Sequence, residues 1–173
     1  VVDSTQDWAM GVPAPARGAA VFLADVQTAG RGRRGRAWQT DPDGALAFTV
    51  LRRFALPPRR LAPLGPAIGV AVVRGLQALG TTAVRLKWPN DLVVDDAKLG
   101  GLLIEARGEA VAIGIGVNLA VGALPTVEQP WTDLRRAGLA EAPRVRVLGA
   151  VLRALLPALT TFEREGFPAF VDD

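Results

Sequence analysis

Four short apolar segments that follow one another between residues 84 and 117 constrain the fold more than any other feature of the chain. They span residues 84–88, 92–94, 99–105 and 110–117, and turn-forming residues separate them. Short apolar runs bounded in this way are typical of β-strands, and residues 95–97 have the character of a hairpin turn. Strands joined by such short connections pair antiparallel. The sequence therefore predicts a mostly antiparallel sheet here.

Helical periodicity appears on both sides of these strands. Apolar side chains recur every three or four residues over residues 61–79, which predicts an amphipathic helix that ends at Gly80. The same spacing over residues 148–162 predicts a second long helix, in which Pro157 is tolerated as a kink. We therefore expect two long helices packed against the sheet.

The N-terminal quarter adds shorter elements. Ser4, with Asp7 three residues later, predicts the N-cap of a short helix that runs to Met10. Residues 19–25 form a short apolar run, interpreted as a buried strand, and residues 45–51 form another strand. The order of helix, strands, helix, hairpin-connected strands and helix predicts an α+β fold with a mostly antiparallel or mixed sheet.

Length and composition limit the number of domains, the cellular location and the catalytic groups that we expect for this chain. With 173 residues, of which 50% are hydrophobic, the chain is expected to form one domain over residues 1–173. Apolar stretches such as residues 67–73 are too short to span a bilayer, and no signal peptide is recognised, so we expect a cytoplasmic protein without a membrane partner. The chain has no Cys, His or Tyr, which excludes disulfides, thiol nucleophiles and a histidine base.

The densest charge lies in residues 30–36, called here the arginine loop. Four arginines and three glycines share these seven residues, and Trp38 follows. Glycine lets the backbone turn its N–H groups toward a ligand, and arginine forks suit phosphate and carboxylate oxygens. The segment therefore predicts an anion-binding loop, although it has neither a Walker nor a Rossmann pattern. A disordered basic loop that contacts RNA is the alternative.

Only two of the 20 basic residues are lysines, Lys87 and Lys98. Lysine is a compact point charge on a flexible stem, whereas arginine is a fixed planar fork. Both lysines are therefore candidates for a site, and solvated surface lysines are the alternative. Asn90 and Asp91 lie between them, where they either form an ordinary turn or serve the site, with Asp91 as a ligand for Mg²⁺. The glycine pair at residues 100–101 would let a ligand approach the strand closely.

A glycine-rich strand is expected at residues 113–118. Glycine alternates there with apolar residues, and the segment ends at Asn118, whose amide can bind a polar edge of a ligand. Alternatively, these glycines only relieve crowding between a helix and the sheet.

Taken in chain order, these segments resemble one family. The catalytic domain of bacterial biotin protein ligases, the biotin–[acetyl-CoA-carboxylase] ligases, has a similar series, here Ser4-Thr5, Gln27, the arginine loop with Trp38, KWPNDL, KLGGLLIE and GIGVN. The resemblance covers residues 3–119, and the arginine loop together with KWPND is its most specific part. It implies a biotin/lipoate ligase-like fold, related more distantly to class II aminoacyl-tRNA synthetases.

The resemblance also implies that biotin, ATP and Mg²⁺ share one site, in which Lys98 and Arg33 are catalytic. Lys98 would hold both the biotin carboxylate and the α-phosphate, Trp38 would supply a platform for adenine, and Asp91 would bind Mg²⁺. The residues implied for biotin are Ser4, Thr5, Gln6, Gln27, Gly30, Arg31, Gly32, Arg33 and Lys98, of which Arg31 to Arg33 would cover the biotin tail and the new phosphate. Those implied for ATP are Arg33, Arg36, Trp38, Asn90, Asp91, Lys98 and Asn118.

The implied reaction activates biotin to biotinyl-5′-AMP and transfers it to a lysine of the biotin carboxyl carrier protein of acetyl-CoA carboxylase. A carboxylate is already ionised at neutral pH, so its attack on the α-phosphorus of ATP needs alignment and charge neutralisation rather than a strong base. A lipoate- or octanoate-protein ligase or transferase on the same scaffold is one alternative. A basic nucleic-acid-binding module is another.

The chain departs from the family pattern in three places. Gln6 stands where the family commonly has Asn, at the end of the site that holds the biotin ring. No helix-turn-helix precedes Ser4, so we expect no N-terminal DNA-binding domain and no DNA partner. The chain stops at Asp173, so we expect the small C-terminal β-barrel of many members to be absent.

Overall fold

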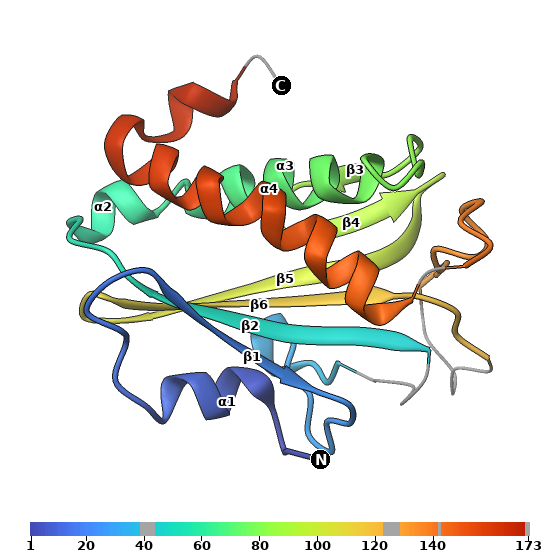
Figure 1. Ribbon diagram of the computed structural model, residues 1–173, viewed down its shortest axis with the longest axis horizontal. Helices are drawn as coiled ribbons and strands as arrows, with labels where there is room; N and C mark the ends of the chain where they lie inside the picture. Colours follow the sequence, from blue (N-terminus) through green and yellow to red (C-terminus); the bar gives the residue numbers. More distant parts are fainter. Residues whose placement is uncertain (39–43, 123–128, 142, 172–173) are drawn as a thin grey trace.

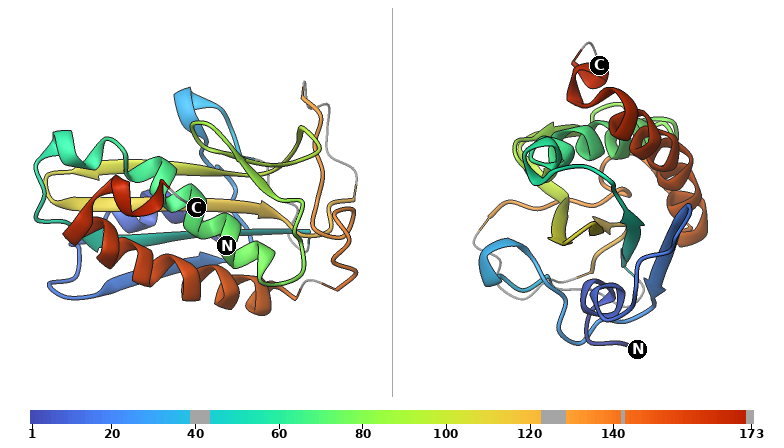
Figure 2. Two further views of the ribbon diagram at one scale, coloured as in Figure 1. Left: turned by 90° about the horizontal axis from the view of Figure 1, so that it is seen from above. Right: turned by 90° about the vertical axis from the view of Figure 1, so that its left-hand side faces the viewer.

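A six-stranded sheet forms the centre of the protein in the computed structural model, which describes residues 1–38, 44–122, 129–141 and 143–171. The strand order is β1-β2-β6-β5-β4-β3, and every neighbouring pair is antiparallel. Two long helices, α3 and α4, cover one face of the sheet, whereas the short helix α1 and the arginine loop lie on the other (Figures 1 and 2). The predicted α+β fold with an antiparallel sheet is therefore confirmed.

The elements follow the chain in this order. The strands are β1 (Ala19–Ala24), β2 (Ala45–Arg53), β3 (Arg85–Lys87), β4 (Asp91–Val94), β5 (Ala97–Arg107) and β6 (Ala110–Asn118). The α-helices are α1 (Thr5–Met10), α2 (Pro58–Leu61), α3 (Leu64–Gln77) and α4 (Arg144–Glu165), and two 3₁₀ turns are η1 (Arg33–Gly35) and η2 (Phe167–Phe170).

The start of α1 and the β4–β5 hairpin turn lie where the sequence pattern predicted them. The Ser4 hydroxyl accepts hydrogen bonds from the backbone N–H groups of Gln6 and Asp7, as an N-cap does. Asp95 and Asp96 have φ of 47° and 62°, the left-handed conformation that a two-residue hairpin turn requires. Ala97 belongs to β5, so the turn is one residue shorter than predicted.

Two predicted elements were wrong in part. The helix predicted over residues 61–79 is divided into α2 and α3 at Ala62-Pro63, because Pro63 has no N–H with which to continue the hydrogen-bond ladder of α2. The strand predicted as buried at residues 19–25 is β1, at the edge of the sheet, where it pairs only with β2. Its Val21 and Leu23 side chains are consequently 40% and 37% exposed.

The core lies between the sheet and the two long helices. Phe48, Val50, Ile113 and Ile115 point from β2 and β6 into this layer and are almost fully buried. The helix α4 continues through Pro157, as predicted, and buries an apolar stripe made of Val147, Val151, Leu155, Leu159 and Phe162. By length and composition alone α4 could cross a membrane, contrary to the sequence expectation, but in the fold this stripe packs into the core.

Candidate active site

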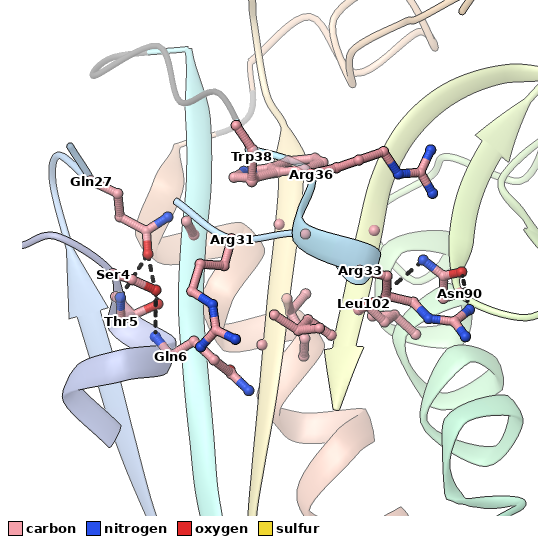
Figure 3. Close-up of a pocket in the computed structure, with 18 of the residues that line it drawn as sticks. Ser4, Thr5, Gln6, Gln27, Arg31, Arg33, Arg36, Trp38, Asn90 and Leu102 are labelled. Carbon is pink, nitrogen blue, oxygen red and sulfur yellow. Dashed lines mark hydrogen bonds between the residues drawn. The ribbon is translucent and has the colours of Figure 1, made fainter. Parts of the chain in front are cut away.

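A cavity of about 460 Å³ opens on the face of the sheet opposite α3 and α4 (Figure 3). Its floor is formed by β2, β6 and β5, one end by the start of α1, and its cover by the arginine loop. The segment around Trp131 closes the far end. A cavity of this size accommodates a drug-sized ligand, and it brings together most of the residues that the sequence proposed for a site.

Small side chains give the floor its depth. Ala47 pairs with Gly116, which pairs with Gly101, so three small residues lie in one row across the sheet. A Cβ atom on Gly116 would lie 2.5 Å from the Trp38 ring, and one on Gly114 would lie 2.7 Å from Gln6 Oε1. Both glycines therefore line the cavity. Gly114 also leaves room for Gln6 of α1, so for this glycine the expected relief of crowding between a helix and the sheet holds as well.

The end of the cavity near α1 is polar and uncharged. The backbone N–H and the hydroxyl of Thr5 both donate to Gln27 Oε1, at 2.7 and 2.9 Å (Figure 3). The Thr49 hydroxyl, from the neighbouring strand β2, lies 3.0 Å from Thr5 Oγ1. Together with Ser4 these groups present hydroxyl and amide dipoles to a ligand without a net charge.

Gln6 is buried in this polar end, and its amide orientation is fixed. Its Nε2 donates to Glu105 Oε2 at 3.0 Å and to the carbonyl of Ala112 at 3.3 Å. Its Oε1 accepts from the Thr49 hydroxyl at 3.3 Å. A glutamine at this position is long enough to reach β5 and β6, so this departure from the family pattern is accommodated with all of its polar atoms paired.

The arginine loop folds back on itself over the cavity. The backbone N–H of Gly32 donates to the carbonyl of Arg36 at 2.7 Å, and the N–H of Trp38 donates to the carbonyl of Gly30 at 2.8 Å. Gly30 lies at the base of the loop and does not itself line the cavity, whereas Gly32 does. The sequence prediction of a glycine-shaped loop at this site therefore agrees with the structure.

The arginine side chains of the loop have different environments. Arg31 forms ion pairs with Asp7 at 2.5 Å and with Glu105 at 2.6 Å. The pKa of Arg31 is raised above its ordinary value, mainly by the hydrogen bond to Asp7. The hydrogen bond and the charge of Glu105 raise it further. Arg33 instead donates to Asn90 Oδ1 at 2.8 Å, at the opposite side of the cavity (Figure 3).

Lys98 lies in a chain of polar contacts that begins at Arg33. Its Nζ is 3.0 Å from Asp91 Oδ1, which also accepts from Asn90 Nδ2 at 3.1 Å. Arg33, Asn90, Asp91 and Lys98 therefore form one connected network beside the cavity, and all but Asp91 line it directly. Asn90 and Asp91 thus have contacts beyond those of an ordinary turn.

A β-bulge directs Lys98 to this side of the sheet. Leu92 pairs with Gly100 and Val93 with Lys98, so β5 carries one extra residue, Leu99, against β4. Such an insertion changes the alternation of side chains along the strand. Leu99 is buried in the core, whereas Lys98 Cε lies 3.6 Å from the position of a Cβ atom on Gly101. The bulge therefore brings Lys98 and the floor of the cavity together.

The second lysine is placed elsewhere. Lys87 is exposed on β3, the edge strand, and does not line the cavity. Its neighbour Trp88 is exposed as well. The structure therefore favours the surface alternative for Lys87 and the site alternative for Lys98.

Several cavity residues were missed by the sequence analysis. The backbone of Lys98 bonds to Pro130 and Thr132, both at 2.9 Å, which brings Trp131 to the far end of the cavity. The Arg136 guanidinium lies 4.2 Å from the centroid of the Trp131 ring. With four tryptophans in the chain, Trp131 could have been noticed by its rarity, but nothing local indicated its position. The other missed polar residues of the lining are Thr49 and Gln129. Asp7 and Glu105, which lie outside the lining and pair with Arg31, were missed as well.

The far end combines aromatic and amide groups. Asn118 is buried, and its Nδ2 donates to the carbonyl of Thr132 at 2.9 Å. Trp38 lies over Gly116, and among the described residues its Nε1 has no hydrogen-bond partner although it is buried. The predicted position of Trp38 and Asn118 at one end of the site is consistent with this arrangement.

Acidic residues are sparse around the cavity. Within the described ranges no three His, Cys, Asp or Glu side chains are grouped as a metal centre. Asp91 offers a single carboxylate, and its Oδ1 is already paired with Lys98. A Mg²⁺ ion bound here would therefore depend on oxygen ligands from a nucleotide and water, as Mg²⁺ often does.

Comparison with known proteins gives a consistent result. Residues 2–120 match the model of the "Biotin/lipoate A/B protein ligase family". The chain is 33% identical to the "Bifunctional ligase/repressor BirA" of Escherichia coli over an alignment of 178 residues, which covers 99% of this chain and 55% of that protein. It is 35% identical over 139 residues to the "Biotin--[acetyl-CoA-carboxylase] ligase" of Mycobacterium tuberculosis, covering 78% of this chain and 52% of the relative. The chain thus spans about half the length of these curated relatives.

A solved structure is also similar. The "Biotin protein ligase from Aquifex aeolicus in complex with biotin and ATP" superposes with a TM-score of 0.82 and 30% sequence identity. The similarity covers 98% of this chain and 72% of that one.

Proposed function

Since the chain belongs to the biotin/lipoate A/B protein ligase family, we propose that it activates biotin with ATP and transfers it to a protein lysine. The acceptor is a biotin carboxyl carrier protein of acetyl-CoA carboxylase. The observation that carries the proposal is the polarity of the cavity, with hydroxyls and amides at one end and the Lys98 network at the other. Biotin has the same division between a neutral ureido ring and a carboxylate.

The first step joins the two substrates. An oxygen of the biotin carboxylate forms a bond to the α-phosphorus of ATP, the bond from that phosphorus to the β-phosphate oxygen breaks, and pyrophosphate leaves. Because the attacking group is already an anion, the protein has to hold two anions together and stabilise the charge that develops. Lys98 and Arg33 are the cations for this task. Asp91 orients the Lys98 ammonium at 3.0 Å before substrate binds.

The second step transfers the biotinyl group. The neutral amine of the acceptor lysine attacks the carbonyl carbon of biotinyl-5′-AMP, the bond from that carbon to the phosphate oxygen breaks, and AMP leaves while the amine loses a proton. The mixed anhydride must be kept from water in the meantime, a role for the arginine loop, which covers the cavity. We assign the adenine to the far end, between Trp38, Asn118 and Trp131.

The contribution of Mg²⁺ is limited by the residues present. Asp91 is the carboxylate that would hold the ion, with the remaining ligands from the nucleotide and water. When bound, Mg²⁺ would neutralise phosphate charge. Cytoplasmic localisation and one domain over residues 1–173 remain part of the same proposal.

A transfer assay distinguishes the proposal from its alternatives. Labelled biotin should be incorporated into a carrier protein only with ATP present, whereas labelled lipoate or octanoate should not be incorporated. The end with hydroxyl and amide groups favours biotin, because lipoate has no ring N–H or ring carbonyl to pair with them. Salt-sensitive binding to RNA that is independent of ATP, together with no transfer, would favour a nucleic-acid module instead.

Replacement of Arg33 by glycine should let the reactive intermediate escape. The variant loses the contact between the loop and Asn90, so it should hold biotinyl-5′-AMP less tightly, whereas biotin, bound mainly at the other end, should be affected less. We expect lysines of bystander proteins to become labelled with biotin. The measurement is biotin incorporation into serum albumin added to the reaction, with Arg34→Gly as a control, since Arg34 is exposed and lies outside the cavity lining. Equal labelling by both variants would contradict the assignment.

Trypsin should report closure of the loop. Four cations in seven residues repel one another, so we expect the loop to open more often without ligand than when an anion neutralises it. Biotin plus ATP should therefore protect the bonds after Arg31, Arg33, Arg34 and Arg36. Cleavage after the exposed Arg17, which precedes β1, serves as the internal control. Equal rates of loop cleavage with and without saturating ligand, followed by mass spectrometry, would exclude the loop as the cover.

A further inference from the structure

The arginine loop is fastened to the protein mainly through side chains. Its backbone hydrogen bonds, from Gly32 to Arg36, from Arg36 to Arg33 and from Trp38 to Gly30, stay within the loop and its base. In the described part of the chain, the polar contacts that tie it to other elements come from Arg31 and Arg33. Opening of the loop therefore requires these side-chain contacts to break.

Arg31 joins the loop to two separate elements. Its Nη1 contacts Asp7 Oδ1 on α1 at 2.5 Å and Glu105 Oε2 on β5 at 3.2 Å, while its Nη2 contacts Glu105 Oε1 at 2.6 Å. The planar guanidinium thus makes a bidentate contact with Glu105 and a further one with Asp7. Charge-assisted contacts of this geometry are the stronger kind of ion pair.

The same contacts place the loop next to the polar end of the cavity. Glu105 also accepts from Gln6 Nε2 at 3.0 Å, and Gln6 lines the cavity whereas Glu105 and Asp7 do not. The two carboxylates therefore act behind the binding surface. They also supply two of the negative charges nearest to a loop that carries four positive ones.

We propose that Asp7 and Glu105 are positioning residues that hold the arginine loop closed through Arg31, and so set the rate at which the ligand escapes. The role assigned to the ligand rests on the proposed function, whereas the effect on the loop does not. The Arg31 and Asp7 side chains are 41% and 52% exposed, so the contact is accessible to ions from solution. Salt should consequently weaken it.

The first test needs no ligand. Asp7→Asn with Glu105→Gln keeps the size of both side chains and leaves an oxygen at position 105 to accept from Gln6, but removes the charge that holds Arg31. In the ligand-free protein, tryptic cleavage after Arg34 should be about three- to tenfold faster in this double variant, the effect of losing a partly exposed ion-pair network. Cleavage after Arg17 should be unchanged.

A matched control is available at the turn of the hairpin that carries Glu105. Arg53 and Glu109 form an exposed ion pair at 3.0 Å that does not contact the loop or the cavity. Glu109→Gln removes a carboxylate from a pair of the same kind, so it should leave cleavage after Arg34 as in the parent. An equal increase in this control would overturn the proposal.

The second test measures ligand escape. Protein loaded with labelled biotin is diluted into excess unlabelled biotin, at about 0.05 and 0.5 M salt, a range over which screening of exposed charges changes strongly. We expect the double variant to release biotin about three- to tenfold faster at low salt and the parent to approach that rate at high salt. In the ligand-free cleavage test, adding Arg31→Gln to the double variant should not speed cleavage after Arg34 any further, because the partners of Arg31 are already gone.

The two tests distinguish the positioning role of Asp7 and Glu105 from the proposal that biotin is the ligand. Unchanged cleavage after Arg34 and unchanged release in the double variant, or a full additional effect of Arg31→Gln on cleavage of the ligand-free protein, would overturn the role of Asp7 and Glu105. Faster cleavage in the double variant together with a parent protein that retains no labelled biotin would support the positioning role and count against biotin as the ligand.

Discussion

Replacing Lys98 with arginine should abolish adenylate formation even though the charge is preserved. The ammonium of Lys98 lies 3.0 Å from Asp91, and the β-bulge holds it over the floor of the cavity beside Gly101. A guanidinium is wider and planar, and it cannot follow an oxygen from the carboxylate to the phosphate in the same space. Loss of one preorganised cation at a developing charge lowers the rate by roughly 100- to 1000-fold.

The measurement is biotin-dependent exchange of labelled pyrophosphate into ATP, which reports the first step alone. Lys87→Arg is the matched control, because Lys87 is the only other lysine in the sequence and is exposed outside the cavity. It should retain activity close to that of the parent. Exchange by Lys98→Arg within a few-fold of the parent would remove Lys98 from the reacting centre.

Replacing Gly114 with valine should weaken biotin binding while leaving the fold intact. Gly114 lies in the middle of β6, where a β-branched residue suits the backbone. Its Cβ atom would nevertheless lie 2.7 Å from Gln6 Oε1, and the two methyl groups would enter the polar end of the cavity. Overpacking of this kind costs about 1–3 kcal/mol, which corresponds to about a 5- to 150-fold loss of affinity.

Calorimetry with biotin measures this loss directly, and circular dichroism verifies that the sheet is retained. Gly149→Ala is the control, since its Cβ atom would meet nothing closer than the Arg153 side chain at 3.6 Å, on the surface of α4. That variant should bind biotin as the parent does. Unchanged affinity in Gly114→Val would show that the ring does not lie against this part of the floor.

The sequence alone determined the local structural features, which depend on residues close to one another in the chain. The N-cap at Ser4, the turn at Asp95 and Asp96, and the strands on either side of that turn follow from short-range hydrogen bonding and from the periodicity of apolar residues. The identity of most cavity residues also followed, because the arginine loop, KWPND and the glycine strand form a specific series. Residue type and spacing carry this information without a fold.

The tertiary structure decided what depends on strands that are distant in sequence. Whether Gly114 and Gly116 face α3 and α4 or the cavity is set by the register of β6 against β2 and β5, which no local pattern specifies. The partners of Arg31 come from positions 24 residues before it and 74 residues after it, and Trp131 reaches the cavity through backbone bonds to Lys98. Long-range pairing of this kind arises only when the sheet has formed. The bulge in β5, which directs Lys98 toward the cavity, belongs to this pairing, so the sequence could not distinguish Lys98 from Lys87 as the site residue.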